Sequence, residues 1–401
     1  MVNTIAAHKA IQYTHAYDTI KPPLFASLAG EITGVGLLFS EGDDHRRQRR
    51  LLAGPFSLPS LKKILPVFQS EAGVLSNQFE SILLQRFREL YDRLFNQGRL
   101  GQLISAINAF IPIRRFVPLK ANRRYVNANR DLRIMTRQII EERDAALKNG
   151  SFKKKAGDIR DLLTYMLEEV HAQQQETGVT IWTTDDIVGH LLNFTAAGHE
   201  TSATALAWSL YALSTRHEIQ SRLRTEIQEF LSRTTSPTPS YEEINGLHYL
   251  NNFVREILRL YSPEGVYIPK GTQIDLHMPI MHLSTQVWGP DAEVFNPDRW
   301  DKLTGDAANP YAFQAFAQGP RMCPGRNMAI IQIKATLIEL LSKWQFLGIE
   351  RWEGKRAADG EQGEGELLVG GEEAIGRSVK LANPALTYHP AGGLMVRFER
   401  L

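Results

Sequence analysis

The order of apolar and polar residues predicts a helix-rich chain over its first two thirds, with no internal repeat and no long low-complexity tract. One predicted helix contains "DDHRRQRRLLAG" and opens at Asp43 or Asp44, because acidic residues favour the start of a helix. Another begins near Val126 and is closed by Gly150. Both segments precede the longest apolar run of the sequence.

That apolar run follows "WTT" and predicts the longest helix. Thr183 and Asp186 are spaced as a capping box, in which each side chain bonds the backbone amide of the other. From there the helix is expected to extend to about Ser214. A later helix, "LHYLNNFVREILRLY", ends where Ser262 meets Pro263, because the residue before a proline is pushed out of the helical region.

The last third of the chain shows a different pattern, in which proline and glycine recur every few residues and predict turns and short strands. Residues 328–344 are again helical. Residues 353–376 are rich in glycine and glutamate, and we expect a mobile surface loop there. The end of the chain alternates like a hairpin around Gly392 and Gly393. Together the patterns predict a mainly α fold with small β-sheets.

Composition narrows the classes of function. The 401 residues are 43% hydrophobic, enough for a large core, and a formal charge of +2 gives no general field for nucleic acid. A single cysteine excludes disulfides and zinc sites with several thiolates. No run approaches the roughly 20 apolar residues of a membrane span, and the amino terminus has no secretion signal. We therefore expect a soluble or membrane-peripheral protein.

The single cysteine lies in "FAQGPRMCPG". A lone intracellular cysteine is most often an inert core thiol, but the neighbours of Cys323 favour a different interpretation. Gly319 and Gly325 permit unusual backbone and close approach, Phe316 can shield a sulfur, and Arg321 supplies a permanent cation. The thiol also directly precedes a helix, where amide donors favour a thiolate. A shielded thiolate suits a soft metal centre such as haem iron.

These ten residues resemble the haem-binding signature F-x-x-G-x-R-x-C-x-G of the cytochrome P450 family. The resemblance implies the helix-rich fold of that family, haem (iron protoporphyrin IX) as cofactor, and Cys323 as the axial ligand of the iron. Three further motifs follow the order of the family, and the end of the chain, "LTYHPAGGLMVRFERL", is also similar to a cytochrome P450 terminus.

The motif "AAGHETS" lies in the middle of the longest predicted helix. Ala197 and Gly198 remove side-chain bulk where a ligand approaches, and the Thr201 hydroxyl is expected to bond the carbonyl four residues earlier. The motif resembles the family's A-G-x-E-T-S, which implies that Glu200 and Thr201 manage protons during oxygen activation. Taken alone, the same residues also describe a helix packed closely at small side chains.

The motif "EILR" places Glu256 and Arg259 on one helical face. An exposed pair of this kind contributes only about 0.2–0.5 kcal/mol. The resemblance implies that Arg299, from "FNPDRW", joins them in a buried network, and that loss of one member costs roughly 3–5 kcal/mol. We assign these three residues to the fold.

The run "GDDHRRQRR" has two interpretations. Four arginines in five positions are typical of a nucleic-acid or nuclear-localisation patch, but the acidic start favours a partly solvated helix face. The resemblance implies that His45 and Arg49, four residues apart, bind haem propionates with help from Arg321. The remaining arginines would then meet an acidic reductase.

The chain also departs from the family. The resemblance covers 1–401 as a single domain that lacks the usual N-terminal anchor and first strands. A core helix is shortened after "SNQFESILLQRF", and "RLYSPEGVYIPKGT" omits a segment that usually lines the substrate pocket and lends an arginine to a propionate. These gaps indicate either a naturally shortened chain or misplaced exon boundaries.

The resulting hypothesis is a haem-thiolate monooxygenase that inserts one atom of O2 into an apolar small molecule held near Leu191, Phe194 and Ala197. Electrons would come from NADPH-cytochrome P450 reductase, since no dinucleotide fingerprint appears. The sequence is most similar to fungal members that modify secondary metabolites, at a cytoplasmic or endoplasmic-reticulum-peripheral location. The alternatives are a non-catalytic haem-binding relic, and an isomerase or peroxide-using enzyme without a reductase.

Overall fold

The fold is built from helices that surround one long central helix. The computed structural model describes residues 4–21, 30, 34, 36–78, 104, 107–108, 113–149, 161–178, 180–234, 236, 238–261, 266–270, 272–276, 278–351, 366–368, 381–382, 389–390 and 396–401. The α-helices are α1 (Ile5–Lys9), α3 (Gly42–Leu51), α4 (Leu58–Gln78), α7 (Lys120–Lys148), α8 (Leu162–Thr177), α9 (Thr184–Thr215), α10 (His217–Arg233), α11 (Tyr241–Asn245), α12 (His248–Leu260), α13 (Met278–His282), α14 (Thr285–Trp288) and α15 (Arg326–Lys343).

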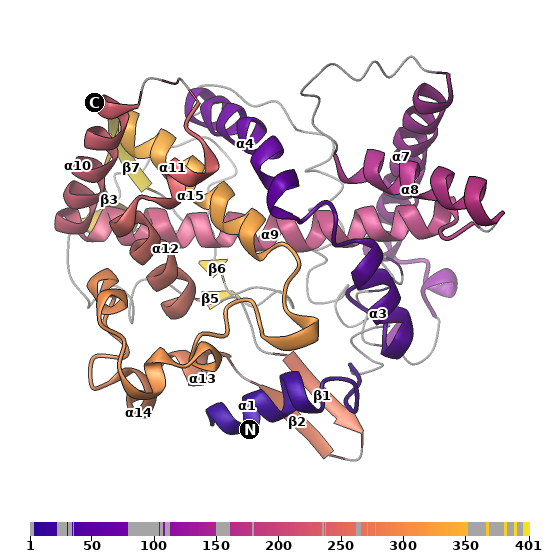
Figure 1. Cartoon of the computed structure of the whole chain (residues 1–401), viewed down its shortest axis with the longest axis horizontal. Helices are drawn as coiled ribbons and strands as arrows, with labels where there is room; N and C mark the ends of the chain where they lie inside the picture. The colour runs from indigo at the N-terminus through magenta and orange to yellow at the C-terminus, as the bar shows by residue number, and fades with distance from the viewer. Residues whose placement is uncertain are drawn as a thin grey trace.

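The central helix is α9, which crosses the whole molecule (Figure 1). It begins as predicted, because the Thr183 side chain accepts the Asp186 amide while the Asp186 carboxylate accepts the Thr183 amide. The capping box is thus confirmed, and the helix ends at Thr215, one residue beyond the expected end. Its C-terminal half packs into the main core with α10, α12 and α15.

That core forms because each of these helices buries an apolar stripe. On α12 the stripe includes Leu250, Phe253, Val254 and Ile257, all of which are almost fully buried. A second apolar cluster joins the first half of α9 to α7 and α8. The two clusters hold opposite halves of α9, so the middle of that helix is the part that remains accessible.

Two other helices differ from prediction at their starts. Helix α3 begins at Gly42 and has Glu41 at its cap position, so Asp43 and Asp44 lie inside its first turn. Helix α7 begins at Lys120, several residues before the expected start. Its start follows an extended stretch and has no capping side chain, so no local sequence signal marks it.

Within the described ranges, the strands form three small antiparallel sheets. The strands are β1 (Val266–Lys270), β2 (Thr272–Leu276), β3 (Trp344–Arg351), β4 (Glu366–Leu368), β5 (Leu381–Ala382), β6 (His389–Pro390) and β7 (Val396–Arg400). The first two strands pair with each other, β3 lies between β4 and β7, and β5 pairs with β6. Mainly α with small sheets is therefore the confirmed fold class.

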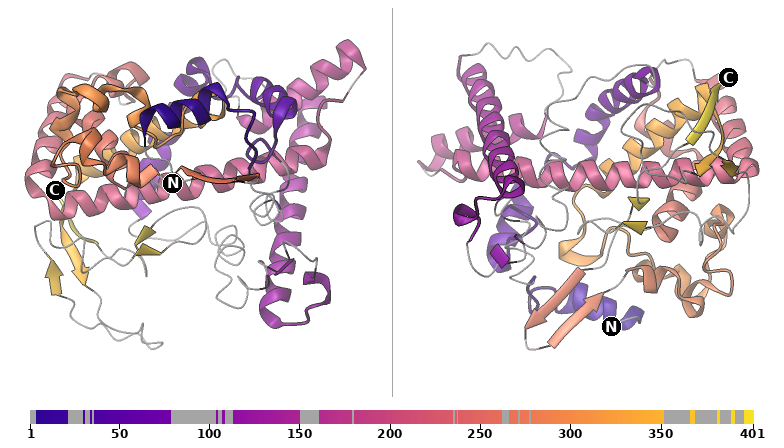
Figure 2. Two further views of the ribbon diagram at one scale, coloured as in Figure 1. Left: turned by 90° about the horizontal axis from the view of Figure 1, so that it is seen from below. Right: turned by 180° about the vertical axis from the view of Figure 1, so that it is seen from behind.

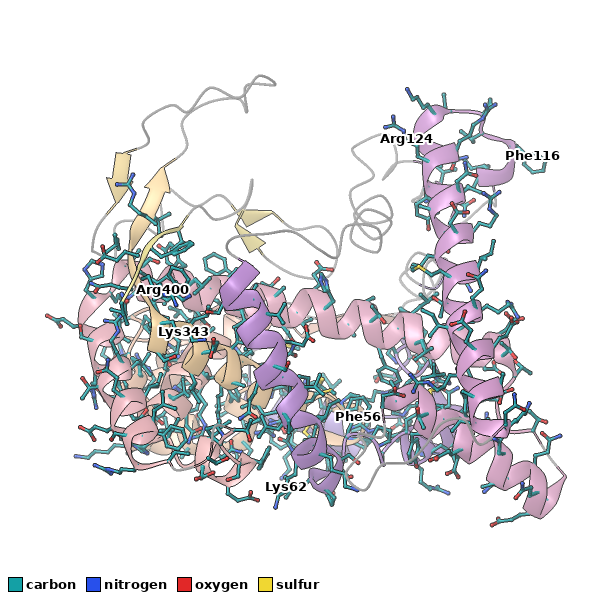
Figure 3. All side chains as sticks on the ribbon, turned by 90° about the horizontal axis from the view of Figure 1, so that it is seen from above. Phe56, Lys62, Phe116, Arg124, Lys343 and Arg400 are labelled. Atoms are coloured by element: carbon teal, nitrogen blue, oxygen red, sulfur yellow. The ribbon has the colours of Figure 1, made fainter. Side chains whose placement is uncertain are left out.

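The predicted terminal hairpin is wrong, since β6 and β7 pair with different strands. Strand β7 pairs with β3 instead and brings Arg400 beside the end of α15, where Lys343 lies (Figure 3). The Lys343 carbonyl accepts the amide of Leu401 at 2.9 Å. Of the loop expected over 353–376, the described residues 366–368 form strand β4, and the others lie outside the described part of the chain.

Helix α7 projects away from the rest of the fold (Figures 2 and 3). Its distal end carries Arg124, and Phe116 on the preceding turn is 76% exposed. The shortened helix expected after "SNQFESILLQRF" falls in 79–103, outside the described residues. Within the ranges that the structure describes, no helix combines the length and apolar character needed to span a membrane.

Candidate haem site

The cysteine lies in a loop that we call the Cys loop, residues 313–325, directly before α15. The Cys323 amide donates to the carbonyl of Phe316 at 2.9 Å, which closes the loop on itself. The backbone amides of Gly325 and Arg326 donate to the sulfur. These donors belong to the first turn of the helix, so the position of Cys323 follows from where α15 begins.

The electrostatics of Cys323 differ from the sequence-based expectation. Burial raises the pKa of the thiol, and the two amide donors and the cation of Arg49 only partly offset this effect. The predicted amide donors are therefore present and lower the pKa of the thiol, but desolvation of the charged sulfur outweighs them. A metal ion would reverse the balance, since coordination deprotonates a thiol outright.

The backbone conformation and the close packing at position 319 require a glycine. Its φ is +72°, and a Cβ there would overlap the carbonyl oxygen of Gln12 in the short π-helix η1 (Ala10–Thr14) that follows α1. The close approach predicted for Gly319 is thus to the chain itself. Ala317 also has a positive φ of 54°, a strained conformation for a residue with a side chain. Gly325, by contrast, has an ordinary φ of −83°.

Arg321 points from the Cys loop into a group of charged side chains near the N-terminus. Its Nη2 pairs with the carboxylate of Glu41, and its Nε donates to the carbonyl of Ala16 at 3.1 Å. Lys21 pairs with the same carboxylate at 3.4 Å. The ring of Tyr17 lies under the Arg321 guanidinium, with 5.1 Å between the guanidinium carbon and the ring centroid.

The two residues predicted on α3 reach the same place. His45 is 4% exposed, and its Nδ1 lies 3.1 Å from the hydroxyl of Tyr17. Burial, followed by the cations of Arg321, Lys21 and Arg49, lowers the pKa of His45 to about 4. Burial lowers the pKa of Arg49 as well, and the nearby Cys323 opposes that shift. The four-residue spacing on α3 therefore does place both side chains beside the Cys loop.

In this cluster the positive charges outnumber the carboxylates. Burial and the neighbouring Arg321 lower the pKa of Lys21 to about 8, which shows that cations crowd one another here. Glu41 is the one carboxylate among the groups that shift these pKa values, and its own pKa is lowered by Lys21 and Arg321 although burial opposes this. The Nη1 of Arg321 is buried and has no hydrogen-bond partner in the described structure. A cofactor with two carboxylates would fit this charge.

Tyr17, Lys21 and Glu41 are part of this cluster, although no sequence motif marks them. They belong to a stretch without a motif, and only packing against Arg321 brings them to the site. For Glu41 the sequence did offer a signal, because this residue directly precedes α3 and carboxylates are favoured at helix starts.

Acidification is expected to destabilise the haem-free chain through His45. Its pKa is about 4 when folded and near 6.5 when unfolded, so between these values only the unfolded chain binds the proton. The free energy of unfolding should therefore fall as the pH drops from about 6.5 to about 4, by up to about 1.4 kcal/mol per pH unit. Urea unfolding across that range should show the slope, and His45→Asn should reduce it. Equal slopes in both proteins would contradict this origin.

The middle of α9 carries the acid and alcohol pair. The Thr201 hydroxyl donates to the carbonyl of Ala197 at 2.6 Å, the bond predicted from the sequence. Ala197 and Gly198 are exposed, and a Cβ built on Gly198 would meet no atom within 4 Å. Glu200, the residue directly before Thr201, is partly buried. This surface of α9 is thus open and free of bulk, as a site for a large flat ligand requires.

Apolar side chains connect α9 with the Cys loop. The ring of Phe194 lies 5.4 Å from that of Phe56, the residue labelled near the start of α4 in Figure 3. Phe56 in turn lies against Gly325. Leu191, one turn before Phe194, packs against the apolar cluster shared with α7 and α8. The predicted pocket residues Leu191 and Phe194 therefore share one apolar region, whereas Ala197 lies on the open surface.

A pocket of about 180 Å³ lies between these groups. It separates Arg49 from Pro324, the residue after the cysteine, and Leu37, Leu52, Ala53 and Phe56 complete its lining. A larger hollow of about 490 Å³ is lined by residues in 285–307 and includes only Arg299 of the predicted site residues. The smaller pocket is the relevant one of these two, because Arg49 and Pro324 of the Cys loop both line it.

The Glu256, Arg259 and Arg299 side chains meet in one buried network. Arg259 donates to both carboxylate oxygens of Glu256, at 2.9 and 2.8 Å, and both side chains are fully buried. Arg299 reaches the same carboxylate at 3.4 Å and Asp291 at 2.9 Å. The Trp300 indole adds a further donor at 3.0 Å. The several donors to the Glu256 carboxylate offset the desolvation cost of burying its charge, which a single ion pair would compensate less completely.

Comparison with known proteins identifies the family of this chain. A cytochrome P450 family model matches residues 83–351 of the 401, which include the α9 motif, the buried network and the Cys loop. The chain belongs to the cytochrome P450 family. His45 and Arg49 precede the matched range, so their assignment depends on the geometry alone.

Several cytochrome P450 proteins are similar over most of the chain. Cytochrome P450 monooxygenase 205 of Postia placenta is 26% identical over 86% of this chain and 76% of its own. Cytochrome P450 monooxygenase sphH of Aspergillus fumigatus is 26% identical over 86% of this chain and 73% of its own. Cytochrome P450 716A67 of Medicago truncatula is 28% identical over 78% and 67%, respectively.

Haem is the cofactor of this cytochrome P450 family, and the described residues fit it. One sulfur with two amide donors stands beside an excess of cations, and the Nη1 of Arg321 is a buried donor that a propionate would satisfy. The chain thus belongs to a family of haem-thiolate monooxygenases, whose members use a redox partner, O2 and a substrate.

Proposed function

We propose that this chain is an active haem-thiolate monooxygenase with Cys323 as the axial ligand of the iron. The observation that carries the proposal is the sulfur itself, which accepts two backbone amides beside a cation cluster that lacks matching carboxylates. Arg321, His45, Arg49 and Lys21 would hold the propionates. Phe316 fixes the loop through its carbonyl, and Gly319 allows the loop to pack against η1.

Haem, when bound, supplies the activation of O2 and the oxidation of the substrate. The protein supplies position and protons. Thr201 holds a proton at Oγ1, which its bond to the Ala197 carbonyl orients, and Glu200 on the same helix exchanges protons with solvent. Ala197 and Gly198 leave space for the ligand, and Leu191 and Phe194 favour an apolar substrate.

The substrate class and partner are inferred from the relatives. Two of the similar proteins are fungal monooxygenases, which supports a role in fungal secondary-metabolite biosynthesis. NADPH-cytochrome P450 reductase is the proposed electron donor, with the chain cytoplasmic or peripheral to the endoplasmic reticulum. On α3, Arg46 and Arg47 pair with the aspartates of their own helix, so they offer the reductase less free charge than the sequence indicates.

One observation favours a second candidate, a shortened haem-binding chain without turnover. Helix α12 ends at Leu260 and β1 begins at Val266, so few residues connect the network to the sheet. The sequence therefore leaves little room for the pocket-lining segment that the family resemblance leads one to expect there.

Reductase-driven turnover separates the two candidates. The chain, purified with haem, is mixed with NADPH and a fungal cytochrome P450 reductase, and its carbon monoxide complex is recorded in the reduced state. The monooxygenase should show the red-shifted Soret band of thiolate ligation and consume NADPH and O2 with an added apolar substrate. Stoichiometric haem with no oxidised product from a panel of apolar compounds would support the non-catalytic alternative.

In that assay Thr201→Ala should divert electrons to hydrogen peroxide, because the variant has no hydroxyl to hold the proton. General acid–base groups typically contribute about 100- to 10,000-fold, so product formed per NADPH should fall steeply while haem content stays normal. Thr201→Ser keeps the hydroxyl and serves as the control. Unchanged coupling of NADPH to product in Thr201→Ala would count against the role.

A further inference from the structure

We propose that His282 is a positioning residue that fixes the Cys loop for metal ligation through the backbone of Gln314. The inference rests on the proposed role of Cys323 and adds a residue outside every motif that identified the site. His282 ends α13, far from the cysteine in sequence, and is fully buried.

The contacts of His282 connect two structural units. Its Nε2 lies 2.7 Å from the backbone nitrogen of Gln314, which donates to it, and its ring stacks on Phe313 with centroids 5.6 Å apart. On the other side, the carbonyl of His282 accepts from the Nη1 of Arg259 at 2.6 Å. One residue therefore joins the buried Glu256–Arg259 network to the start of the Cys loop.

The ring nitrogen can play this role only as an acceptor. Because Nε2 accepts the Gln314 amide, the neutral ring carries its proton on Nδ1. The charged and titratable groups that act on it are Arg259 of α12, itself paired with Glu256, and His8 of α1. Burial, followed by Arg259, lowers the pKa of His282 to about 3, so the ring stays neutral and the acceptor is present at physiological pH.

Two backbone hydrogen bonds within the Cys loop connect Gln314 with Cys323. The Gln314 carbonyl accepts the amide of Ala317 at 2.8 Å, and the Phe316 carbonyl accepts the amide of Cys323 at 2.9 Å. Gln314 is itself fully buried, so its amide has no water to replace the imidazole. Without the imidazole acceptor, the Gln314 amide no longer anchors the N-terminal side of the strained turn at Ala317.

Two variants separate the acceptor from the packing. His282→Leu fills the space without an acceptor, and His282→Gln replaces Nε2 by an amide oxygen. In the reduced carbon monoxide complex, His282→Leu should convert from the thiolate-type band to the blue-shifted inactive form about 5- to 150-fold faster than the unmodified protein. His282→Gln should restore most of the lifetime. Ile227→Ala, in the core on α10, controls for general destabilisation and should leave the band stable.

A second measurement does not need haem. Hydrogen–deuterium exchange of the haem-free chain, read on peptides within 313–325, should show lost protection in His282→Leu and retained protection in His282→Gln. If the unmodified protein lacks the thiolate band, the proposed function fails while exchange still decides the positioning role. Identical exchange in His282→Leu and the unmodified protein, or equal losses in both His282 variants, would overturn the inference.

Discussion

Replacing Cys323 by serine is expected to abolish the red-shifted Soret band of the reduced carbon monoxide complex and to remove reductase-driven oxidation. Serine keeps the size of the side chain and the amides of Gly325 and Arg326, but its alcohol does not supply a soft thiolate. This is the largest expected effect on activity, because the described residues offer no second cysteine. Absorption spectra and NADPH consumption measure it directly.

Met322→Leu is the matched control, because it removes the neighbouring sulfur of the loop and keeps Cys323. That sulfur lies 3.9 Å from the Nη1 of Arg326, a weak contact whose loss should leave the band in place. A Cys323→Ser protein that kept the band would exclude Cys323 as the ligand, whereas a Met322→Leu protein that also lost it would show that the loss is not specific to the thiol.

Arg259→Met should give the largest loss of stability among single changes. It preserves much of the volume but leaves the fully buried Glu256 carboxylate without its bidentate partner, and the carbonyls of His282 and Ala292 lose donors at 2.6 Å. Breaking a buried pair in this way costs about 3–5 kcal/mol, a large share of a net stability of about 5–15 kcal/mol. Urea unfolding should show the loss, accompanied by poor haem retention.

Arg137→Met provides the comparison. Arg137 pairs with Asp185 between α7 and α9, and both side chains are largely exposed, so its loss should cost less than about 1 kcal/mol. If the two variants lost similar free energies of unfolding, the network would not be the structural centre that its burial indicates.

Local signals predicted the parts of the fold that depend on neighbouring residues. The capping box at Thr183, the end of α12 near Leu260 and the hydroxyl bond of Thr201 all involve residues a few positions apart, so the sequence contains their full cause. The start of α7 and the terminal hairpin were predicted wrongly, because tertiary packing sets the first residue of α7 and the pairing of β7 with β3.

The sequence by itself determined which groups the site can offer, since one cysteine, two small residues on α9 and the Glu256–Arg259 spacing are set by residue type and order. The tertiary structure alone decided how that chemistry is held. Glu41 pairs with Arg321 across 280 positions of sequence and also with Lys21, and His282 reaches the Cys loop from another helix. Burial, which no local pattern encodes, raises the pKa of Cys323 and makes the metal the partner that would hold it as a thiolate.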